Sequence, residues 1–313
     1  MKTLKRCDKQ MEEKIKEKLA AISKKHGGKV LFAHSLKDLS TMRTGGSADS
    51  VYMAGTIEEI VDVKVLLDEA KEKMRVLGRG SNTLLPEGEF RGTIILLNGG
   101  IFQDIRFAER KVTVGSGVRL ERFISECRMK RLSGMEGLIG IPATIGGAVR
   151  MNAGYKEEIS DRLTKVLVLD RSNKIKWIDK EKIEFGYRRS SFSSDTFILA
   201  AEFEMEVSTR IDVEKKLKDL FGEKNEKQPL KERTLGCIFK NPSTHAKSAG
   251  ELIDLCGMKG ARSGGAVVSN KHANFIINDR DAKVSDITDL ISKMRKAVKE
   301  RFLVDLEIEI EIW

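Results

Sequence analysis

The chain has 313 residues, 40% of them hydrophobic, and a formal net charge of +10 at pH 7. This length is enough for two or three domains with cores of their own. The positive charge favours polyanionic ligands. However, no cluster of Lys and Arg is interleaved with aromatic residues, so a phosphorylated small molecule explains the charge as well as a nucleic acid does.

The sequence predicts neither a signal peptide in its N-terminal segment nor a membrane-spanning segment. The N-terminal MKTLKRCDKQMEEK is charged throughout and lacks the apolar core of a signal peptide. No apolar run approaches the length that spans a bilayer. The four cysteines show neither CxxC pairing nor the spacing of metal ligands: Cys7, Cys127, Cys237 and Cys256. We therefore expect a cytoplasmic protein with reduced thiols, no metal site and no membrane insertion.

Residues 1–25 alternate Lys and Glu with apolar residues at helical spacing, which predicts an amphipathic helix. These apolar positions are Met11, Ile15, Leu19 and Ile22. Residues 37–50 contain TMRTGGSAD, whose glycine pair indicates either a hairpin turn or a loop that approaches a ligand.

Residues 51–80 form the clearest local unit. A short strand, VYMA, precedes Thr56, whose hydroxyl with Glu59 predicts a capping box for a helix that runs to about Met74. A second strand, MRVLG, then leads into the loop GRGSN. Such a strand–helix–strand unit with a glycine loop can bind phosphate. The loop matches neither GxGxxG nor GxxxxGK[ST], so it is only suggestive.

The remaining elements are predicted from the spacing of apolar residues and from the positions of turn residues. We expect strands at 93–97, 112–114, 165–170, 174–178, 196–203 and 272–278, and helices at 120–129, 211–221 and 249–257. An exposed charged connector is expected up to Arg233, with a domain boundary near residue 206. An amphipathic helix should end near Phe302, and LEIEIEIW should close the chain as a strand with one apolar face.

The stretch Gly134–Gly154, GMEGLIGIPATIGGAVRMNAG, carries six glycines in 21 positions. Glycine lets the backbone approach a ligand closely, and clustered backbone N–H groups form anion-binding concavities. A run of tight turns between short strands explains the composition equally well. The stretch alone does not decide between these interpretations.

Taken in order, several segments resemble the UDP-N-acetylenolpyruvoylglucosamine reductases, the MurB family, and in particular its second, shorter type. They are TMRTGGSA, VLGRGSNTLL, GLIGIPATIGGAVRMNAG, FGYRRSSF, GCIFKNP, AGELIDLCGMKG, GGAVVSNKHANFIIN and FLVDLEIEIEI. The resemblance implies an α+β fold: a two-part FAD-binding unit of the vanillyl-alcohol-oxidase (PCMH) type, followed by an α+β substrate-binding domain. The expected division is an N-terminal helix at 1–25, FAD-binding subdomains at 26–92 and 93–205, and a substrate-binding domain at 206–313.

The resemblance also implies a reaction in peptidoglycan precursor synthesis. NADPH would reduce bound FAD, and the flavin would pass the hydride to UDP-N-acetylglucosamine enolpyruvate, giving UDP-N-acetylmuramate. The expected ligands are FAD, NADPH and this UDP-sugar, with no nucleic acid and no obligatory protein partner.

By the same resemblance, three residues would carry the chemistry. Arg188 of the YRxS motif would bind carboxylate and stabilise the enolate-like intermediate. Cys237 stands where the family usually has a serine as proton donor; because a free thiol has a pKa of about 8.5, it can act as the general acid. Glu309 would stabilise the intermediate or assist proton supply. Without the resemblance, Cys237 would be a small buried cysteine, and Glu309 one of three glutamates on a solvated strand face.

The remaining candidates bind cofactor or substrate. For FAD they are Arg43, Gly45, Gly78, Gly80, Ser81, Asn82, Ile141, Ala143, Thr144, Gly146 and Gly147; for substrate they are Tyr187, Lys240, Asn241 and His272. The chain departs from the family at Ala143 and Leu303, where glycine is usual, and at Glu311, where arginine is usual.

Three other functions compete with this one. An FAD oxidase or dehydrogenase acting on an alcohol would keep the fold, but none of the four histidines lies in the glycine-rich loops expected to hold FAD. A cysteine hydrolase would use Cys237 with His245 or His272 as its base. A nucleotide-binding module would bind UDP-sugars without turnover. Only the reductase accounts for every segment at once.

Overall fold

The computed structural model describes the backbone of residues 2–313 and the side chains of residues 11–313. Met1 and the side chain of Cys7 lie outside the described residues. The chain forms two compact units. The first comprises the described residues up to His34 together with Ala48–Gly78 and Arg91–Leu220, and the second comprises Ser35–Ser47, Arg79–Phe90 and Phe221–Trp313. The four-part division expected from the sequence stays a prediction.

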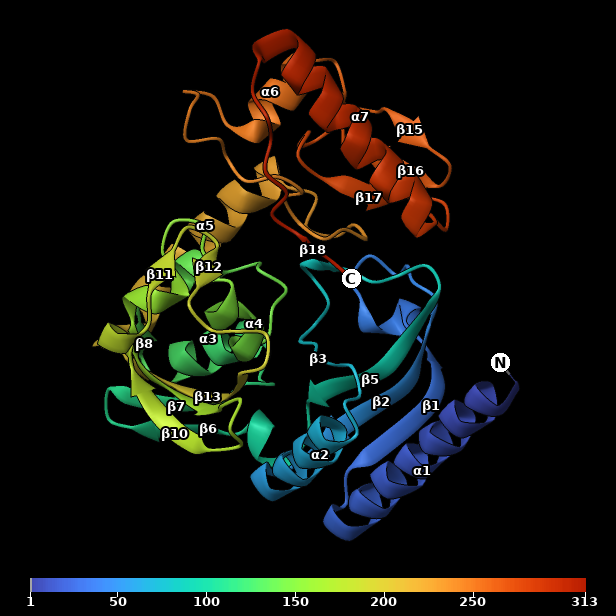
Figure 1. Ribbon diagram of the computed structural model, residues 1–313. Helices are drawn as coiled ribbons and strands as arrows, with labels where there is room; N and C mark the ends of the chain where they lie inside the picture. Colours follow the sequence, from blue (N-terminus) through green and yellow to red (C-terminus); the bar gives the residue numbers. More distant parts are fainter. Residues whose placement is uncertain (1) are drawn as a thin grey trace. The chain divides into compact units, whose positions relative to one another are not determined.

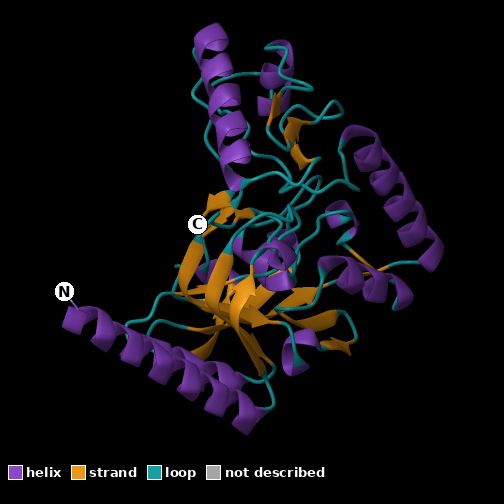
Figure 2. Cartoon of the chain, turned by 90° about the vertical axis from the view of Figure 1, so that its right-hand side faces the viewer, coloured by secondary structure: helices purple, strands orange, loops and turns teal. Residues whose placement is uncertain are grey.

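In the first unit, a four-stranded sheet in the order β1-β2-β5-β3 packs with two helices (Figure 1). The elements are α1 (Lys2–His26), β1 (Lys29–Ser35), β2 (Ser47–Ala54), α2 (Ile57–Glu69), β3 (Met74–Val76) and β5 (Glu89–Leu97). The predicted N-terminal helix is confirmed, and Figure 2 shows it as one long helix leading from the N-terminus. Its Ile15 and Leu19 are buried in a core with Tyr52 and Ile60, whereas Met11 is exposed.

Helix α2 begins as predicted, because Thr56 accepts a hydrogen bond from the backbone N–H of Glu59. The other half of the predicted capping box is wrong. The buried Glu59 carboxylate instead accepts hydrogen bonds from Gly55 N at 2.7 Å and Tyr52 Oη at 2.8 Å. The pKa of Tyr52 is raised, mainly by burial and further by this carboxylate. The helix also ends at Glu69, well before Met74.

The second sheet of this unit is antiparallel, in the order β10-β9-β13-β7-β6. Its strands are β6 (Ile105–Ala108), β7 (Lys111–Gly115), β9 (Leu163–Leu169), β10 (Ile175–Asp179) and β13 (Phe197–Glu204). The helices packed with it are α3 (Leu120–Met129) and α4 (Ile145–Arg150). Two-residue ladders add β8 (Leu132–Ser133) with β14 (Glu206–Val207), and β11 (Phe185–Gly186) with β12 (Arg189–Ser190).

The alternating burial of strand residues explains why one face of this sheet packs against helices. The side chains of β13 are buried at every second position toward the strand end, as expected when one face packs on helices. Phe203 of β13 lies against Phe123 of α3, with ring centroids 5.3 Å apart. The antiparallel strands predicted at 165–170, 174–178 and 196–203 are therefore confirmed.

The second unit has its own core. A three-stranded antiparallel sheet, β15-β16-β17, packs with helices α6 and α7, and a short parallel pair joins β18 to β4. The bounds are β4 (Thr83–Leu84), α6 (Ala249–Leu255), β15 (Arg262–Ser263), β16 (Ala266–Val268), β17 (Ile276–Asn278), α7 (Val284–Phe302) and β18 (Glu311–Ile312). The predicted amphipathic helix is α7, whose buried face includes Ile287, Leu290 and Met294.

Two expectations for the C-terminal third are corrected. The first part of the charged connector is helical: α5 runs over Arg210–Lys227, beyond the predicted end at residue 221, and ends before Arg233. The closing segment is strand only at β18 and an isolated bridge at Ile308. Leu306 and Ile310 are buried as predicted, but Ile312 is 48% exposed, because the chain there pairs with β4 and no longer covers the core.

Leu303 terminates α7 in a left-handed conformation, with φ of +59°, and its side chain is 90% exposed. Glycine is the residue this position favours. We predict that Leu303→Gly raises the free energy of unfolding by about 1 kcal/mol, since the strain disappears and no packing is lost. Denaturant unfolding followed by circular dichroism measures the change. Leu303→Ala is the control, because it removes the side chain but keeps the strain; equal stabilisation by alanine would contradict the explanation.

Candidate active site

In the second unit, the last residues of the chain form a hydrogen-bonded ladder with the GCIFKNP segment. Lys240 N donates to Glu307 O at 2.9 Å, and Glu309 N donates to Ile238 O at 2.8 Å. An antiparallel bridge joins Phe239 to Ile308 between them. The ladder places Cys237 and Glu309, two candidates separated by about seventy residues in the sequence, on adjoining backbone segments.

The same terminal segment then pairs with the loop GRGSN. Glu311 N donates to Asn82 O at 2.8 Å, and the Asn82 side-chain amide donates to Glu309 O at 3.4 Å. Trp313 N continues the pairing by donating to Leu84 O at 3.1 Å. The second unit therefore brings a predicted cofactor loop, the thiol and the glutamate together through main-chain contacts.

Burial in the structure distinguishes the three alternating glutamates, whereas their spacing in the sequence could not. Glu307 is exposed and pairs with the Lys240 ammonium at 2.6 Å. Glu311 is also exposed, and its carboxylate accepts a hydrogen bond from the Trp313 indole. Glu309 alone of the three is half-buried. The half-buried Glu309 carboxylate and the half-buried Cys237 thiol therefore lie on adjoining backbone segments, and both are side chains that can take part in proton transfer.

On its other side, the segment that bears Cys237 is held by Asn274. This buried amide donates to Phe239 O at 2.7 Å and accepts from Phe239 N at 3.0 Å. The backbone of the same asparagine accepts from Ile238 N, and Cys237 forms a bridge with Phe275. The sequence prediction missed Asn274; the signal was an amide inside the apolar run HANFII.

The loop with Arg43 is fixed in a comparable way. Asn278 donates through its buried side-chain amide to Met42 O at 2.8 Å, and Thr41 Oγ1 donates to Thr234 O at 2.7 Å. Arg43 itself is left-handed, with φ of +57°, and its half-exposed guanidinium pairs with Asp38 at 2.7 Å. Strained residues of this kind cluster at ligand-binding sites.

The loops of this unit have features that fit a dinucleotide. Gly80 has φ of +60°, and a Cβ there would lie 2.2 Å from Leu39 O, so only glycine is accommodated. Among the described residues, the backbone N–H groups of Gly80 and Ser81 have no acceptor. Such paired N–H groups can bind pyrophosphate oxygens. Gly45 is similarly restricted, by φ of +129° and the Leu36 side chain.

In the first unit, Gly78 and the segment 141–147 come together. A Cβ on Gly78 would lie 2.7 Å from Thr144 Oγ1. Thr144 caps α4 by accepting from Gly147 N, while Gly146 N donates to Ser116 O. These donors are occupied, so α4 does not supply the anion-binding N–H cluster that the glycine content suggested. The close approach of Gly78 still fits a loop that packs under a flat cofactor, next to the half-buried Ile141.

The departure at Ala143 is compatible with this backbone. Ala143 adopts no positive φ, so the conformation there does not require glycine. Its backbone oxygen accepts from Leu120 N at 2.9 Å and its N–H donates to Ile141 O at 2.9 Å.

Also in the first unit, Tyr187 and Arg188 form the turn of the hairpin β11–β12. Arg188 is left-handed, with φ of +55°, and its guanidinium lies 5.1 Å from the centre of the Tyr187 ring. The Tyr187 side chain is 46% exposed. A cation held against an aromatic face at the tip of a hairpin is pre-oriented, which suits a group that binds a carboxylate.

The other substrate candidates already have partners within the second unit. Asn241 accepts from Ala249 N at 3.1 Å. His272 accepts from Asn274 N through Nδ1 at 3.2 Å, and its ring meets Phe275 edge-on at 4.9 Å. A Cβ on Gly250 would lie 2.8 Å from the His272 ring. His272 is therefore firmly packed, and its Nε2 is the atom left for a ligand.

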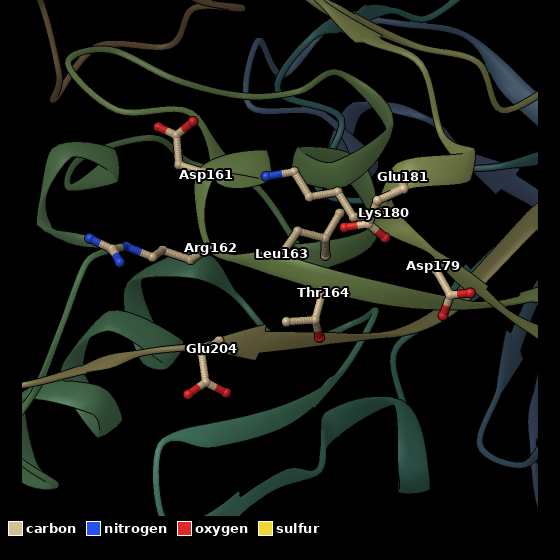
Figure 3. A pocket seen from close by; sticks show the side chains of 8 residues that line it. All are labelled: Asp161, Arg162, Leu163, Thr164, Asp179, Lys180, Glu181 and Glu204. Atoms are coloured by element: carbon tan, nitrogen blue, oxygen red, sulfur yellow. The ribbon is translucent and has the colours of Figure 1, made fainter.

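A surface pocket of about 480 Å³ lies elsewhere in the first unit (Figure 3). Its lining contains none of the predicted site residues and is mostly charged, with more carboxylates than cations: Asp161, Arg162, Leu163, Thr164, Asp179, Lys180, Glu181 and Glu204. This charge is unfavourable for a phosphorylated ligand. Within the described part of the chain, no cluster of His, Cys, Asp and Glu could hold a metal ion, and no helix is both long and apolar enough to span a bilayer.

Comparison with known proteins defines first the class and then the family. Residues 48–179 match a model described as an FAD binding domain, so the first unit contains the framework of a flavoprotein. Residues 228–313 match the C-terminal domain of UDP-N-acetylenolpyruvoylglucosamine reductase. A reductase of that name from Bacillus cereus is 34% identical over 91% of this chain and 95% of its own. One from Bacillus subtilis is 32% identical over 96% and 98%.

The fold agrees with this assignment. The crystal structure of the reductase (MurB) from Thermus caldophilus superposes with a TM-score of 0.78, at 33% identity, over 91% of this chain and 98% of its own. The chain belongs to the UDP-N-acetylenolpyruvoylglucosamine reductase family. The predicted α+β fold with a PCMH-type FAD-binding unit is thereby confirmed.

His272 provides a pH test of the packing in the second unit. Burial, with a smaller effect of Lys259, lowers the pKa of His272 below its ordinary value. The unfolded chain takes up a proton below about pH 6.5, where the folded chain resists it. The contribution of His272 is therefore complete above that pH and decreases as the pH falls.

We predict that the wild-type protein loses more stability between pH 8 and pH 5.5 than His272→Gln does. Urea unfolding of both proteins at both pH values measures this difference, and the pH 8 pair is the control for the substitution itself. An identical loss in both proteins would contradict the explanation that burial of His272 makes stability depend on pH.

Proposed function

We propose that this protein is an NADPH-dependent, FAD-mediated reductase of UDP-N-acetylglucosamine enolpyruvate that forms UDP-N-acetylmuramate for peptidoglycan synthesis. The observation that carries the proposal is the match along nearly the whole chain to reductases of this name. The glycine-restricted loops support FAD as the bound cofactor. We place the enzyme in the cytoplasm and assign it no obligatory protein partner, no nucleic acid and no membrane insertion.

FAD, when bound, would supply the hydride chemistry between NADPH and the substrate alkene. The residues proposed to hold the flavin are those of the restricted loops: Arg43, Gly45, Gly78, Gly80, Ser81, Asn82 and the segment 141–147. Gly80 and Ser81 offer backbone donors for the pyrophosphate. Arg43, at its strained loop position, offers a cation that can exchange Asp38 for a phosphate.

The protein must then manage one negative charge and one proton. Hydride addition to the terminal alkene carbon leaves negative charge on the neighbouring carbon and the carboxylate. The planar guanidinium of Arg188 can bind that carboxylate through two hydrogen bonds. Its stabilisation increases as the charge develops, which is the condition for accelerating the step.

Cys237 is proposed to donate the proton that completes the reduction at the carbanionic carbon. Glu309, on the adjoining backbone segment, stabilises the intermediate or assists reprotonation of the thiol. Tyr187, Lys240, Asn241 and His272 are proposed substrate contacts; for Lys240 this requires exchanging Glu307 for a substrate phosphate.

The overall reaction is tested by NADPH consumption. We expect that purified protein with bound FAD oxidises NADPH rapidly under anaerobic conditions only when UDP-N-acetylglucosamine enolpyruvate is present, in a one-to-one ratio. Absorbance at the NADPH maximum follows the reaction, and UDP-N-acetylglucosamine without the enolpyruvyl group is the control. A yellow protein without sugar-dependent oxidation would instead favour an oxidase or dehydrogenase acting on another substrate.

The proton donor is tested by two substitutions at one position. We predict that Cys237→Ser remains active, while Cys237→Ala slows reoxidation of the reduced flavin by the UDP-sugar by roughly 10²- to 10⁴-fold, the usual contribution of a general acid. Flavin reduction by NADPH should be unchanged in both. Stopped-flow absorbance separates the two half-reactions, and full activity in Cys237→Ala would show that the thiol is not the acid.

A further inference from the structure

Asn152 is a fully buried polar residue near the end of the glycine-rich stretch, with a left-handed backbone at φ of +43°. Asparagine tolerates this conformation better than most residues, but not without strain. The side-chain Oδ1 is enclosed and has no hydrogen-bond partner in the described part of the chain. An enclosed acceptor without a donor destabilises a fold by about 1–3 kcal/mol. Stability alone therefore gives a poor reason for this residue.

The amide nitrogen of Asn152 links two segments. It lies 2.6 Å from Glu158 Oε2 and 3.2 Å from Gly186 O. Both partners are acceptors, so the NH₂ group must face them; the reversed amide would set oxygen against oxygen. Glu158 is held by its own capping box at Asp161. Asn152 is thereby a fixed support for the carbonyl of Gly186.

Gly186 directly precedes the turn residues Tyr187 and Arg188. The hairpin is small: its two strands pair at only two positions, and such a hairpin is marginally stable without outside support. Its other arm is tied to the same stretch, because Ser190 Oγ donates to Arg150 O at 2.7 Å. Both arms are thus attached to the segment that ends α4, one on each side of Arg188.

We propose that Asn152 is a positioning residue for Arg188: its amide holds the hairpin so that the guanidinium is set for the substrate carboxylate. This inference rests on the proposed function, in which Arg188 acts on the substrate. Loss of the amide would free one arm, and a displacement of about 1 Å at a reacting group can slow a reaction on the order of 100-fold. The effect belongs to the step that uses Arg188, the transfer to the UDP-sugar.

Asn152→Gly is the test variant, because glycine adopts the left-handed backbone without strain while the side chain that carries the amide is removed. The chain offers a matched control in Asn173, which is also left-handed, with φ of +58°, but lies in the turn between β9 and β10. No hydrogen bond joins Asn173 to the hairpin among the described residues. Asn173→Gly should behave as wild type in every measurement.

The first measurement is a stopped-flow comparison of the two half-reactions. We expect Asn152→Gly to slow reoxidation of the reduced flavin by the UDP-sugar by at least tenfold, while FAD affinity and reduction by NADPH change less than threefold. In the Arg188→Ala background, Asn152→Gly should add almost nothing, because it acts through Arg188. An unchanged reoxidation rate, or a full additional loss in that background, would overturn the proposal.

The second measurement does not depend on the reaction. Hydrogen exchange should increase at least tenfold in residues 184–192 of Asn152→Gly and remain unchanged elsewhere; no local increase would overturn the proposal. If the wild-type protein does not use the UDP-sugar, the proposed function fails, and exchange decides the role of Asn152 alone. If Asn152→Gly does not fold, Ser190→Ala, which removes the other tie, is measured in its place with the same expectations.

Discussion

The candidate chemistry of the second unit depends on one set of hydrogen bonds, made by the last residues of the chain. Glu309 N donates to Ile238 O and Glu311 N donates to Asn82 O, so one short segment joins the thiol-bearing strand to a cofactor loop. Backbone hydrogen bonds fix register, and a slip of one residue would turn Glu309 away and replace it with an apolar neighbour. The position of the carboxylate therefore depends on this main-chain pairing.

Left-handed backbone at residues other than glycine occurs at some of the proposed functional positions, as it does in turns elsewhere in the described chain. Arg43 and Arg188, proposed to bind cofactor and substrate, and Asn152, proposed to position Arg188, all have positive φ. The strain costs about 1 kcal/mol or more at each position. At Arg43 and Arg188 the side chain supplies a cation that glycine lacks, which gives the strain a use. Leu303 has the same strain with an exposed side chain, and nothing in the structure explains why leucine stands there.

Periodicity predicted much of the fold, whereas the candidate residues came from the resemblance to the family and stay predictions. The helix α1, the antiparallel sheet and the amphipathic helix α7 follow from spacing that burial alone enforces. The failures came where particular side-chain contacts or a change of strand partner decide the structure. The Glu59 side chain left the predicted capping box because Tyr52 and Gly55 compete for it. The closing segment alternates like a strand, yet it changes partners near Glu309, and no pattern within eight residues could reveal that.

The residues that the sequence could least reveal are three buried asparagines, each of which supports a segment with a candidate charge or acid. Asn274 holds the strand of Cys237, Asn278 holds the carbonyl beside Arg43, and Asn152 holds the hairpin of Arg188. In a sequence, asparagine indicates a turn. At Asn274 the two-ended side chain replaces a missing strand partner, because an amide can pair with a backbone group as another peptide would. Asn152 and Asn278 instead each donate from the side-chain NH₂ group to a backbone carbonyl. Irregular loops gain in this way the rigidity that a catalytic group requires, without becoming part of a sheet.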